Sequence, residues 1–140
     1  MNDRQALADL VHRYADGVTR QDLEQWSSCW ADDACWWVGP NRTATGREAI
    51  VALLEDLLGR LEGVVQNVLN GVVSIDHGTA RGQWYIIEHY RRVSGEAALV
   101  LGRYDDTYIY AERDDGWLFA SRTLVTSYHG PPDLSAPFTT

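Results

Sequence analysis

The sequence predicts an α+β domain in which a strongly curled antiparallel sheet wraps around helices from the N-terminal half. Apolar residues recur at helical spacing over 3–18 and again after residue 46. From residue 64 onward, long segments rich in Val, Ile, Tyr and Trp alternate with turn residues. Helices packed on one side of such a sheet leave a pocket between the two layers. We therefore expect a cone-shaped α+β barrel with an open mouth.

The first two helices are predicted from one apolar stripe and one cap. Over residues 3–18 the apolar residues fall three and four positions apart, which places them on one helix face. Gly17 should weaken the last turn of this helix, and residues 19–21 should form a break. Asp22 can then cap a short second helix over 23–31.

A short strand and a third helix are expected next. Residues 34–38 have strand-like composition, and Gly39-Pro40-Asn41 should end the strand. Thr45 and Glu48 have the spacing of a capping box, which predicts the start of the third helix. Its wide leucine-rich face continues until Gly63 closes it.

Four long strands are expected after the third helix. Tight turns at 76–78, 94–96 and 114–116 separate them and imply a single antiparallel meander. Glycines inside the strands permit bulges or bends, so strands this long can curl. The tail 128–140 is expected to be a cap or a loose end. The predicted strands cover 64–76, 79–93, 97–112 and 117–127.

Length and composition favour one domain over residues 1–140. No apolar run reaches the roughly 20 residues of a membrane span. The first residues lack the basic start and apolar stretch of a signal peptide, so a cytoplasmic location is expected. Cys29 and Cys35 are too few for a disulfide scaffold, and free buried thiols are the expected state.

Charge excludes nucleic acid as a partner, because phosphate binding needs a clustered positive surface. The net charge is −8, and the 12 basic residues, all arginine, are spread along the chain. Six Trp and seven Tyr are many for this length. Aromatic rings with polar tips suit a core, and they equally suit a pocket for a small apolar or aromatic molecule.

Several short motifs occur in an order that resembles the SnoaL-like group of the nuclear-transport-factor-two superfamily. The similarity extends from about residue 3 to residue 127, nearly the whole chain. Each motif is loose by itself, and their order is what favours the fold. The motifs are Tyr14 with Asp16, Trp30-Ala31-Asp32-Asp33, Gly46-Arg47-Glu48-Ala49-Ile50, Asn70, Gly102-Arg103-Tyr104 and Gly116-Trp117-Leu118-Phe119.

The resemblance implies a cystatin-like α+β barrel and a cofactor-independent enzyme. No metal site is expected, because no two acidic or histidine residues have the spacing of metal ligands. Members of the family include scytalone dehydratase, a hexachlorocyclohexane dehydrochlorinase, polyketide cyclases and steroid isomerases. We therefore expect a lyase, isomerase or cyclase acting on a ring-bearing apolar substrate, polyketide-like or steroid-like. In dehydratase-like members an Asp at the end of the first helix and a His on the first long strand transfer the proton.

This chain departs from that pattern at both positions. Thr19 stands where the Asp would be, and Gln66 stands where the His would be. Neither side chain exchanges protons near neutral pH, although both can hydrogen-bond a carbonyl or hydroxyl. The usual dehydratase couple is therefore expected to be absent.

The candidate catalytic residues are Tyr14, His89 and Asp16. Tyr14 resembles the pocket tyrosine of the dehydratases, and a core position on the apolar helix face is the alternative. Asp16 lies about 200° around the helix from Tyr14, which favours a structural or surface role for it. His89 could be a general base if it faces the pocket, and would otherwise lie on a surface or interface.

Strand alternation leaves open which face lines the pocket. One face carries Trp84, Ile86, Glu88 and Tyr90, and the other carries Gln83, Tyr85, Ile87 and His89. The candidate substrate-binding residues are Thr19, Trp36, Gln66, Asn70 and Tyr104. In the leading hypothesis Tyr14, Gln66 and Asn70 orient an enolisable carbonyl while His89 moves a proton.

Three alternatives remain open. The cavity could serve a non-catalytic binding or accessory module, since the proton-transfer pair is missing. Residues 35–40 are similar to a strand in the small subunits of ring-hydroxylating dioxygenases. Arg103 and Asp105 have the spacing found in limonene epoxide hydrolases, although an ordinary cross-strand ion pair is the simpler interpretation. Apolar residues on the outer sheet face predict a homodimer or homotrimer.

Overall fold

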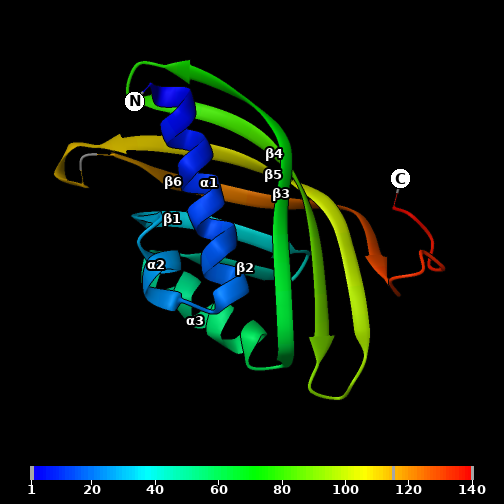
Figure 1. Cartoon of the computed structure of the whole chain (residues 1–140). Coiled ribbons are helices and arrows are strands. Elements are labelled where there is room, and N and C mark those ends of the chain that lie inside the picture. Colours follow the sequence, from blue (N-terminus) through cyan, green and yellow to red (C-terminus); the bar gives the residue numbers. More distant parts are fainter. Residues whose placement is uncertain (1, 115, 140) are drawn as a thin grey trace.

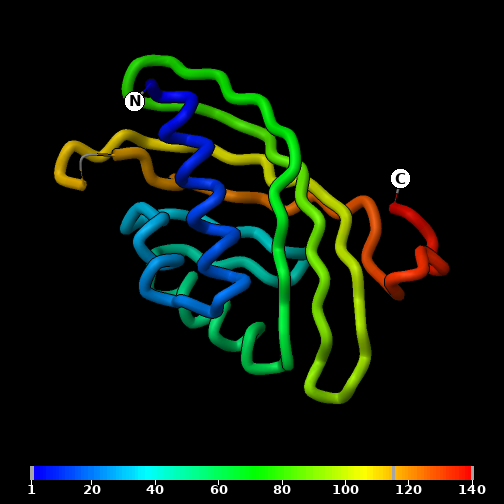
Figure 2. Tube along the Cα trace, viewed as in Figure 1, coloured from blue at the N-terminus to red at the C-terminus, as the bar shows by residue number. Residues whose placement is uncertain are grey.

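A six-stranded curved sheet packs against helices in the computed structural model, which describes residues 2–114 and 116–139. The strand order is β2-β1-β6-β5-β4-β3. The long strands bend around helix α1, as the ribbon and the Cα trace both show (Figures 1 and 2). The strands of the sheet are β1 (Trp30–Gly39), β2 (Arg42–Thr45), β3 (Leu61–Asp76), β4 (Thr79–Arg92), β5 (Ala97–Ala111) and β6 (Gly116–Gly130).

The predicted α+β class and the curled meander are confirmed. Strands β3 to β6 pair antiparallel in sequence order, and β1 joins β6 in parallel, so the sheet is mixed. The sheet does not close on itself, because β2 and β3 form its two edges. Strand β2 was not expected, since its sequence, Arg-Thr-Ala-Thr, has little apolar character.

Helix α1 (Asp3–Arg20) runs two residues further than predicted. It ends at Gln21, whose φ of 55° is left-handed. Gly17 is needed for close packing, because an added Cβ would lie 3.1 Å from the Cβ of Trp26. The two helices therefore approach each other at this glycine.

Helix α2 (Leu23–Ser27) is shorter than predicted. The expected cap is confirmed, since the Asp22 side chain accepts a hydrogen bond from the amide of Gln25. The helix stops early because Trp30 already pairs with Phe119 of β6. Pairing with a distant strand overrides the local helical pattern there.

Helix α3 (Arg47–Leu58) begins without the predicted capping box. Thr45 is still paired with Cys35 in the β1–β2 hairpin, and Gly46 takes the N-cap position with a φ of 89° and no side-chain cap. The helix ends near Gly59 rather than at residue 63, because Leu61 already pairs with Arg92 in the sheet.

The turns and tail follow the prediction with one extension. The 76–78 and 94–96 turns join β3 to β4 and β4 to β5. The third predicted turn includes residue 115, which lies outside the described residues. Strand β6 continues to Gly130, beyond the predicted end at 127, and the tail folds back so that the Tyr128 ring packs on Phe138. No helix within the described ranges is long and apolar enough to cross a membrane.

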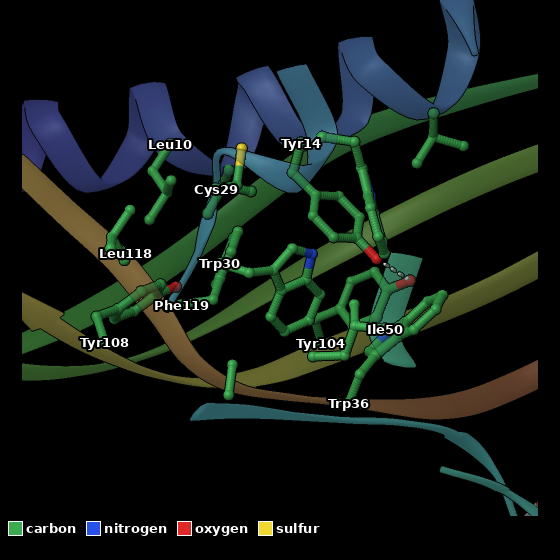
Figure 3. Close-up of a cluster of buried hydrophobic side chains, with 14 of the residues drawn as sticks. Leu10, Tyr14, Cys29, Trp30, Trp36, Ile50, Tyr104, Tyr108, Leu118 and Phe119 are labelled. Atoms are coloured by element: carbon green, nitrogen blue, oxygen red, sulfur yellow. Dashed lines mark hydrogen bonds between the residues drawn. The ribbon is translucent and has the colours of Figure 1, made fainter. Parts of the chain in front are cut away.

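An aromatic cluster fills the space between α1 and the sheet (Figure 3). The rings meet edge-on or tilted, with centroids 5.1–6.0 Å apart, the arrangement that aromatic quadrupoles favour. This cluster forms the floor on which the cavity is built. Its members are Tyr14, Trp26, Trp30, Trp36 and Phe119.

Candidate functional site

A cavity of about 170 Å³ opens between helices α1 and α3 and the inner face of the sheet. Leucines of α3 and aliphatic residues of β1, β3, β5 and β6 give it apolar walls. Polar groups enter from the sheet, and three arginines lie among the lining residues. An apolar hollow with few polar groups is the usual form of a small-molecule site.

Strand pairing decides which face of β4 lines this cavity. Glu88 is paired with the buried Gln66 and with Val100, and all three line the cavity. His89, one residue further, is paired with the exposed Val65 and is itself exposed. The inner face of β4 therefore carries Glu88 and Tyr90, and the outer face carries His89.

Glu88 is the one carboxylate among the described residues that line the cavity. Burial raises the pKa of its carboxyl group above the ordinary value of 4.5, and the hydrogen bond from Gln66 opposes this shift. In that bond the Gln66 Nε2 donates to Glu88 Oε1 at 3.0 Å. A carboxyl group with a raised pKa can exchange protons closer to neutral pH than an exposed one.

Two phenols meet inside the cavity, and Figure 3 shows their hydroxyl groups side by side. The Tyr14 hydroxyl donates to the Tyr104 hydroxyl at 3.4 Å. Burial raises the pKa of Tyr104 to about 12 and also raises the pKa of Tyr14. Both phenols stay protonated near neutral pH. The hydrogen of Tyr104 has no acceptor among the described residues, so it can be donated to a substrate oxygen.

Two further polar atoms in the cavity wall are buried without a partner among the described residues. They are the Oε1 acceptor of Gln66 and the Nε1 donor of Trp36. Buried polar atoms are normally hydrogen-bonded, and unpaired ones are costly. Their position in the wall makes them suitable partners for a polar group on a bound molecule.

A buried ion pair supports the phenols from behind. Arg122 donates to Asp106 through Nε at 2.7 Å and through Nη2 at 3.1 Å. Its guanidinium carbon lies 4.3 Å from the ring centre of Tyr14 and 3.9 Å from that of Tyr104. Burial alone would lower the pKa of Arg122, but Asp106 raises it. The fixed cation holds both rings in place by cation–π contact.

Tyr90, His129 and Arg92 form a second polar group in the cavity lining. The Tyr90 hydroxyl is 2.7 Å from His129 Nε2, and Arg92 Nη2 donates to the same hydroxyl at 3.3 Å. Burial, followed by Arg92 and Arg42, lowers the pKa of His129. His129 is therefore neutral at pH 7, and its Nε2 can accept the Tyr90 hydrogen.

Four of the predicted site residues line the cavity: Tyr14, Trp36, Gln66 and Tyr104. Thr19 does not line it but lies directly beside it. Its hydroxyl accepts a hydrogen bond from the Gln66 amide at 2.9 Å. The two positions that resemble the Asp–His couple therefore lie in contact, but through the backbone N–H and carbonyl of Gln66, while the Gln66 side chain bonds to Glu88.

The other three predicted residues lie outside the cavity. Asp16 is exposed and forms an ion pair with Arg20, because it lies on the helix face opposite Tyr14. Asn70 is exposed next to the β3 bulge between Val68 and Gly71. His89 is exposed on the outer face of β4.

The Arg103–Asp105 pair lies along a single strand, not between strands. Arg103 Nε donates to Asp105 Oδ1 at 2.8 Å. Both side chains are slightly more than one-third exposed. Neither residue lines the cavity. The pair is therefore an ordinary surface ion pair and gives no support to epoxide hydrolysis.

Sequence reasoning missed Glu88, Tyr90 and His129 as site residues. The alternation pattern had grouped Glu88 and Tyr90 with the apolar Trp84 and Ile86, which was a usable signal for an inward face. His129 lies in β6, which the prediction ended at residue 127. A prediction that extended this strand to Gly130 would have placed His129 in the sheet.

Comparison with known proteins shows the family. A family model described as a SnoaL-like domain matches residues 1–123, and the chain belongs to the SnoaL-like family. No curated protein sequence matches the chain significantly.

Solved structures of proteins named for different activities share this fold. A candidate scytalone dehydratase from Novosphingobium aromaticivorans is 20% identical, covers 96% of this chain and 91% of its own, and has a TM-score of 0.85. A candidate aromatic ring hydroxylase from the same organism is 22% identical over 91% of this chain and 92% of its own, also at 0.85. A hexachlorocyclohexane dehydrochlorinase from Novosphingobium barchaimii is 21% identical over 98% and 94%, at 0.83. At these identities the likeness shows the fold alone.

Proposed function

We propose that this protein is a cofactor-independent lyase or isomerase in which Glu88 replaces the Asp–His couple. The observation that carries the proposal is the half-buried Glu88, whose carboxyl pKa is raised, in the same cavity as a free Tyr104 hydroxyl hydrogen. A proton acceptor and a hydrogen-bond donor in one cavity are the two groups that enolisation of a carbonyl compound needs.

The chemistry begins with a substrate carbonyl oxygen that accepts the Tyr104 hydrogen. Ionised Glu88 removes a proton from the neighbouring carbon, and the C–H electron pair forms a C=C bond while the oxygen gains negative charge. In a β,γ-unsaturated ketone, Glu88 returns the proton to the γ-carbon while the C=O bond re-forms and the C=C bond moves to the α,β position, which completes an isomerisation. In a β-hydroxyketone, the C=O bond re-forms, a C=C bond forms between the α- and β-carbons, and the β C–O bond breaks as the hydroxyl group takes the proton from Glu88 and leaves as water, which completes a dehydration.

The size of the cavity narrows the substrate class. An engineered cavity of about 150 Å³ is known to hold benzene, and the cavity here measures about 170 Å³. One small ring fits this space, whereas a four-ring steroid skeleton would need the walls to move. The proposed substrate is therefore a single-ring ketone or hydroxyketone, smaller than the polyketide-like or steroid-like molecules first expected.

The test compares Glu88→Gln with His89→Ala. The first variant keeps the size and hydrogen bonding of the side chain but cannot take a proton. The second removes the imidazole on the opposite face of the same strand. On a substrate found by screening single-ring hydroxyketones, we expect Glu88→Gln to lower kcat by about 10²- to 10⁴-fold and His89→Ala to leave it unchanged. Full activity of Glu88→Gln would remove Glu88 from the mechanism.

A non-catalytic binding module is the second candidate function. The meeting of Thr19 with Gln66 favours it, because neither side chain transfers protons. In that case thermal-shift assays would detect ring compounds that bind the protein, while no compound in the same set would be turned over by the wild-type chain.

A further inference from the structure

We propose that the mouth of the cavity is an anion subsite, and that the substrate is a small ring compound bearing a carboxylate. This inference rests on the proposed function, because the same cavity holds the reacting ring. Arg42, Arg60 and Arg92 lie among the residues lining the cavity, together with His129. They fix the end of the substrate that points toward solvent.

The arginines converge on the mouth from separate elements. Arg42 begins strand β2, Arg60 lies between α3 and β3, and Arg92 ends strand β4. His129 comes from the last residues of β6. The chain as a whole has a net charge of −8. A group of cations around one opening therefore contrasts with the rest of an acidic protein and would attract an anion locally.

The positive charge at the mouth is incompletely balanced. Arg60 is paired with Asp56 at 3.0 Å, and Arg92 has only a 3.4 Å contact with Glu96, which is largely exposed. The Arg42 side chain has no hydrogen bond or ion pair with any residue in the described ranges. Arg92 and Arg42 act on His129 more strongly than Glu96 does. A net positive field therefore remains at this position.

A hydrogen-bond network holds the Arg92 side chain in one orientation. Arg92 donates to the Tyr90 hydroxyl at 3.3 Å, and that hydroxyl is 2.7 Å from His129 Nε2. The Arg92 guanidinium carbon also lies 5.3 Å from the Tyr90 ring centre. A guanidinium group held in this way presents its remaining N–H donors as a fork that matches the geometry of a carboxylate.

The inner part of the cavity and its mouth favour different chemical groups on the ligand. The inner part offers leucine walls, two phenols and the Glu88 carboxyl group, which disfavours a second negative charge there. The mouth offers cations and contact with water. A molecule with an apolar ring at one end and a carboxylate at the other satisfies both, and it can enter in one orientation only.

The test measures binding of trans-cinnamate and of its neutral isostere trans-cinnamamide by titration calorimetry. The two probes share the ring and the shape and differ in charge. We expect cinnamate to bind about 5- to 10-fold more tightly to the wild-type protein. Added salt should weaken cinnamate binding and leave cinnamamide binding nearly constant, because exposed charges are screened.

Single substitutions test which arginines form the anion subsite. Arg42→Gln and Arg92→Gln should each weaken cinnamate about 3- to 10-fold and leave cinnamamide unchanged. Arg113→Gln, at an exposed position after the far end of β5, is the control and should change neither. Equal affinities for the two probes, binding of neither probe, or equal losses in Arg113→Gln would overturn the anion subsite. Because these are equilibrium measurements, they are independent of turnover by Glu88→Gln, and either proposal can fail alone.

Discussion

At the residue scale, the cavity depends on a carboxyl group that burial has changed chemically. Glu88 and Gln66 form a polar pair in the otherwise apolar inner wall. The glutamine holds the ionised form through one hydrogen bond, but burial outweighs that effect and raises the carboxyl pKa. A carboxyl group whose pKa is shifted in this way costs stability, and such groups are typical of functional sites.

The raised pKa of Glu88 has a consequence for stability. In the unfolded chain the carboxyl group ionises near its ordinary value of 4.5, whereas in the folded chain it ionises at a higher pH. Between these values the folded state binds more protons, so the free energy of unfolding falls as pH rises through this window. Below pH 4.5 both states are protonated, and the cost is absent.

The corresponding prediction concerns Glu88→Gln, which removes the ionisation. We expect this variant to gain stability relative to wild type as pH rises above about 4.5, and to show no such gain at lower pH. Urea unfolding at a series of pH values measures the difference. Glu48→Gln, at an exposed position of α3, is the control. A constant difference between Glu88→Gln and wild type across the pH range would contradict the prediction.

At the element scale, the long strands function as one layer only because they bend. Strand β3 has a register shift between Val68 and Gly71, opposite a continuous stretch of β4. Helix α1 packs against β3 on both sides of this bulge, since Arg4 donates to the Val73 carbonyl and the Gln66 backbone N–H donates to Thr19. The stretch before the bulge also lines the cavity, through Leu61, Val64 and Gln66. The bulge therefore bends the strand just beyond the stretch that lines the cavity.

Gly71 is the glycine that this bend requires. A Cβ at this position would lie 2.4 Å from the Trp84 ring and 2.7 Å from the carbonyl oxygen of Gln83. We expect Gly71→Ala to lower the free energy of unfolding by about 1–3 kcal/mol. Gly63→Ala on the same strand is the matched control, because a Cβ there meets nothing within 4 Å. Chemical denaturation of both variants makes the comparison, and equal losses would show that the clash is relieved.

Sequence patterns predict the existence of helices and strands well, but they predict the ends of the shorter helices poorly. The apolar stripe of α1 and the turns of the meander predicted their elements well, because both signals are local. The ends of α2 and α3 were misplaced, since residues that look helical are taken up by pairing with β6 and β4. The capping box at Thr45 failed for the same reason.

At the scale of the whole molecule, one face of the sheet remains uncovered. The helices pack on the inner face, while the outer face exposes apolar side chains at Val65, Val72 and Tyr85. Their exposed fractions are 47%, 70% and 43%. Apolar area gathered on one sheet face is typical of an interface between subunits.

Self-association through this face is the expected outcome, as a homodimer or homotrimer. We expect sedimentation equilibrium to give an oligomer for the wild-type protein and a smaller species for Tyr85→Glu, because a buried unpaired charge opposes assembly. Val93→Asp, at an exposed position in the β4–β5 turn, is the control and should not change the mass. A wild-type monomer at micromolar concentration would exclude this assembly.

The sequence by itself determined the class of fold, the order of its main elements and the presence of tyrosines and a glutamine suited to a pocket. The tertiary structure decided which of two adjacent residues, Glu88 or His89, faces that pocket. Alternation along a strand defines two faces, and both faces of β4 carry apolar residues. Only pairing with Gln66 and Val100, under the layer formed by α1 and α3, makes one face the interior.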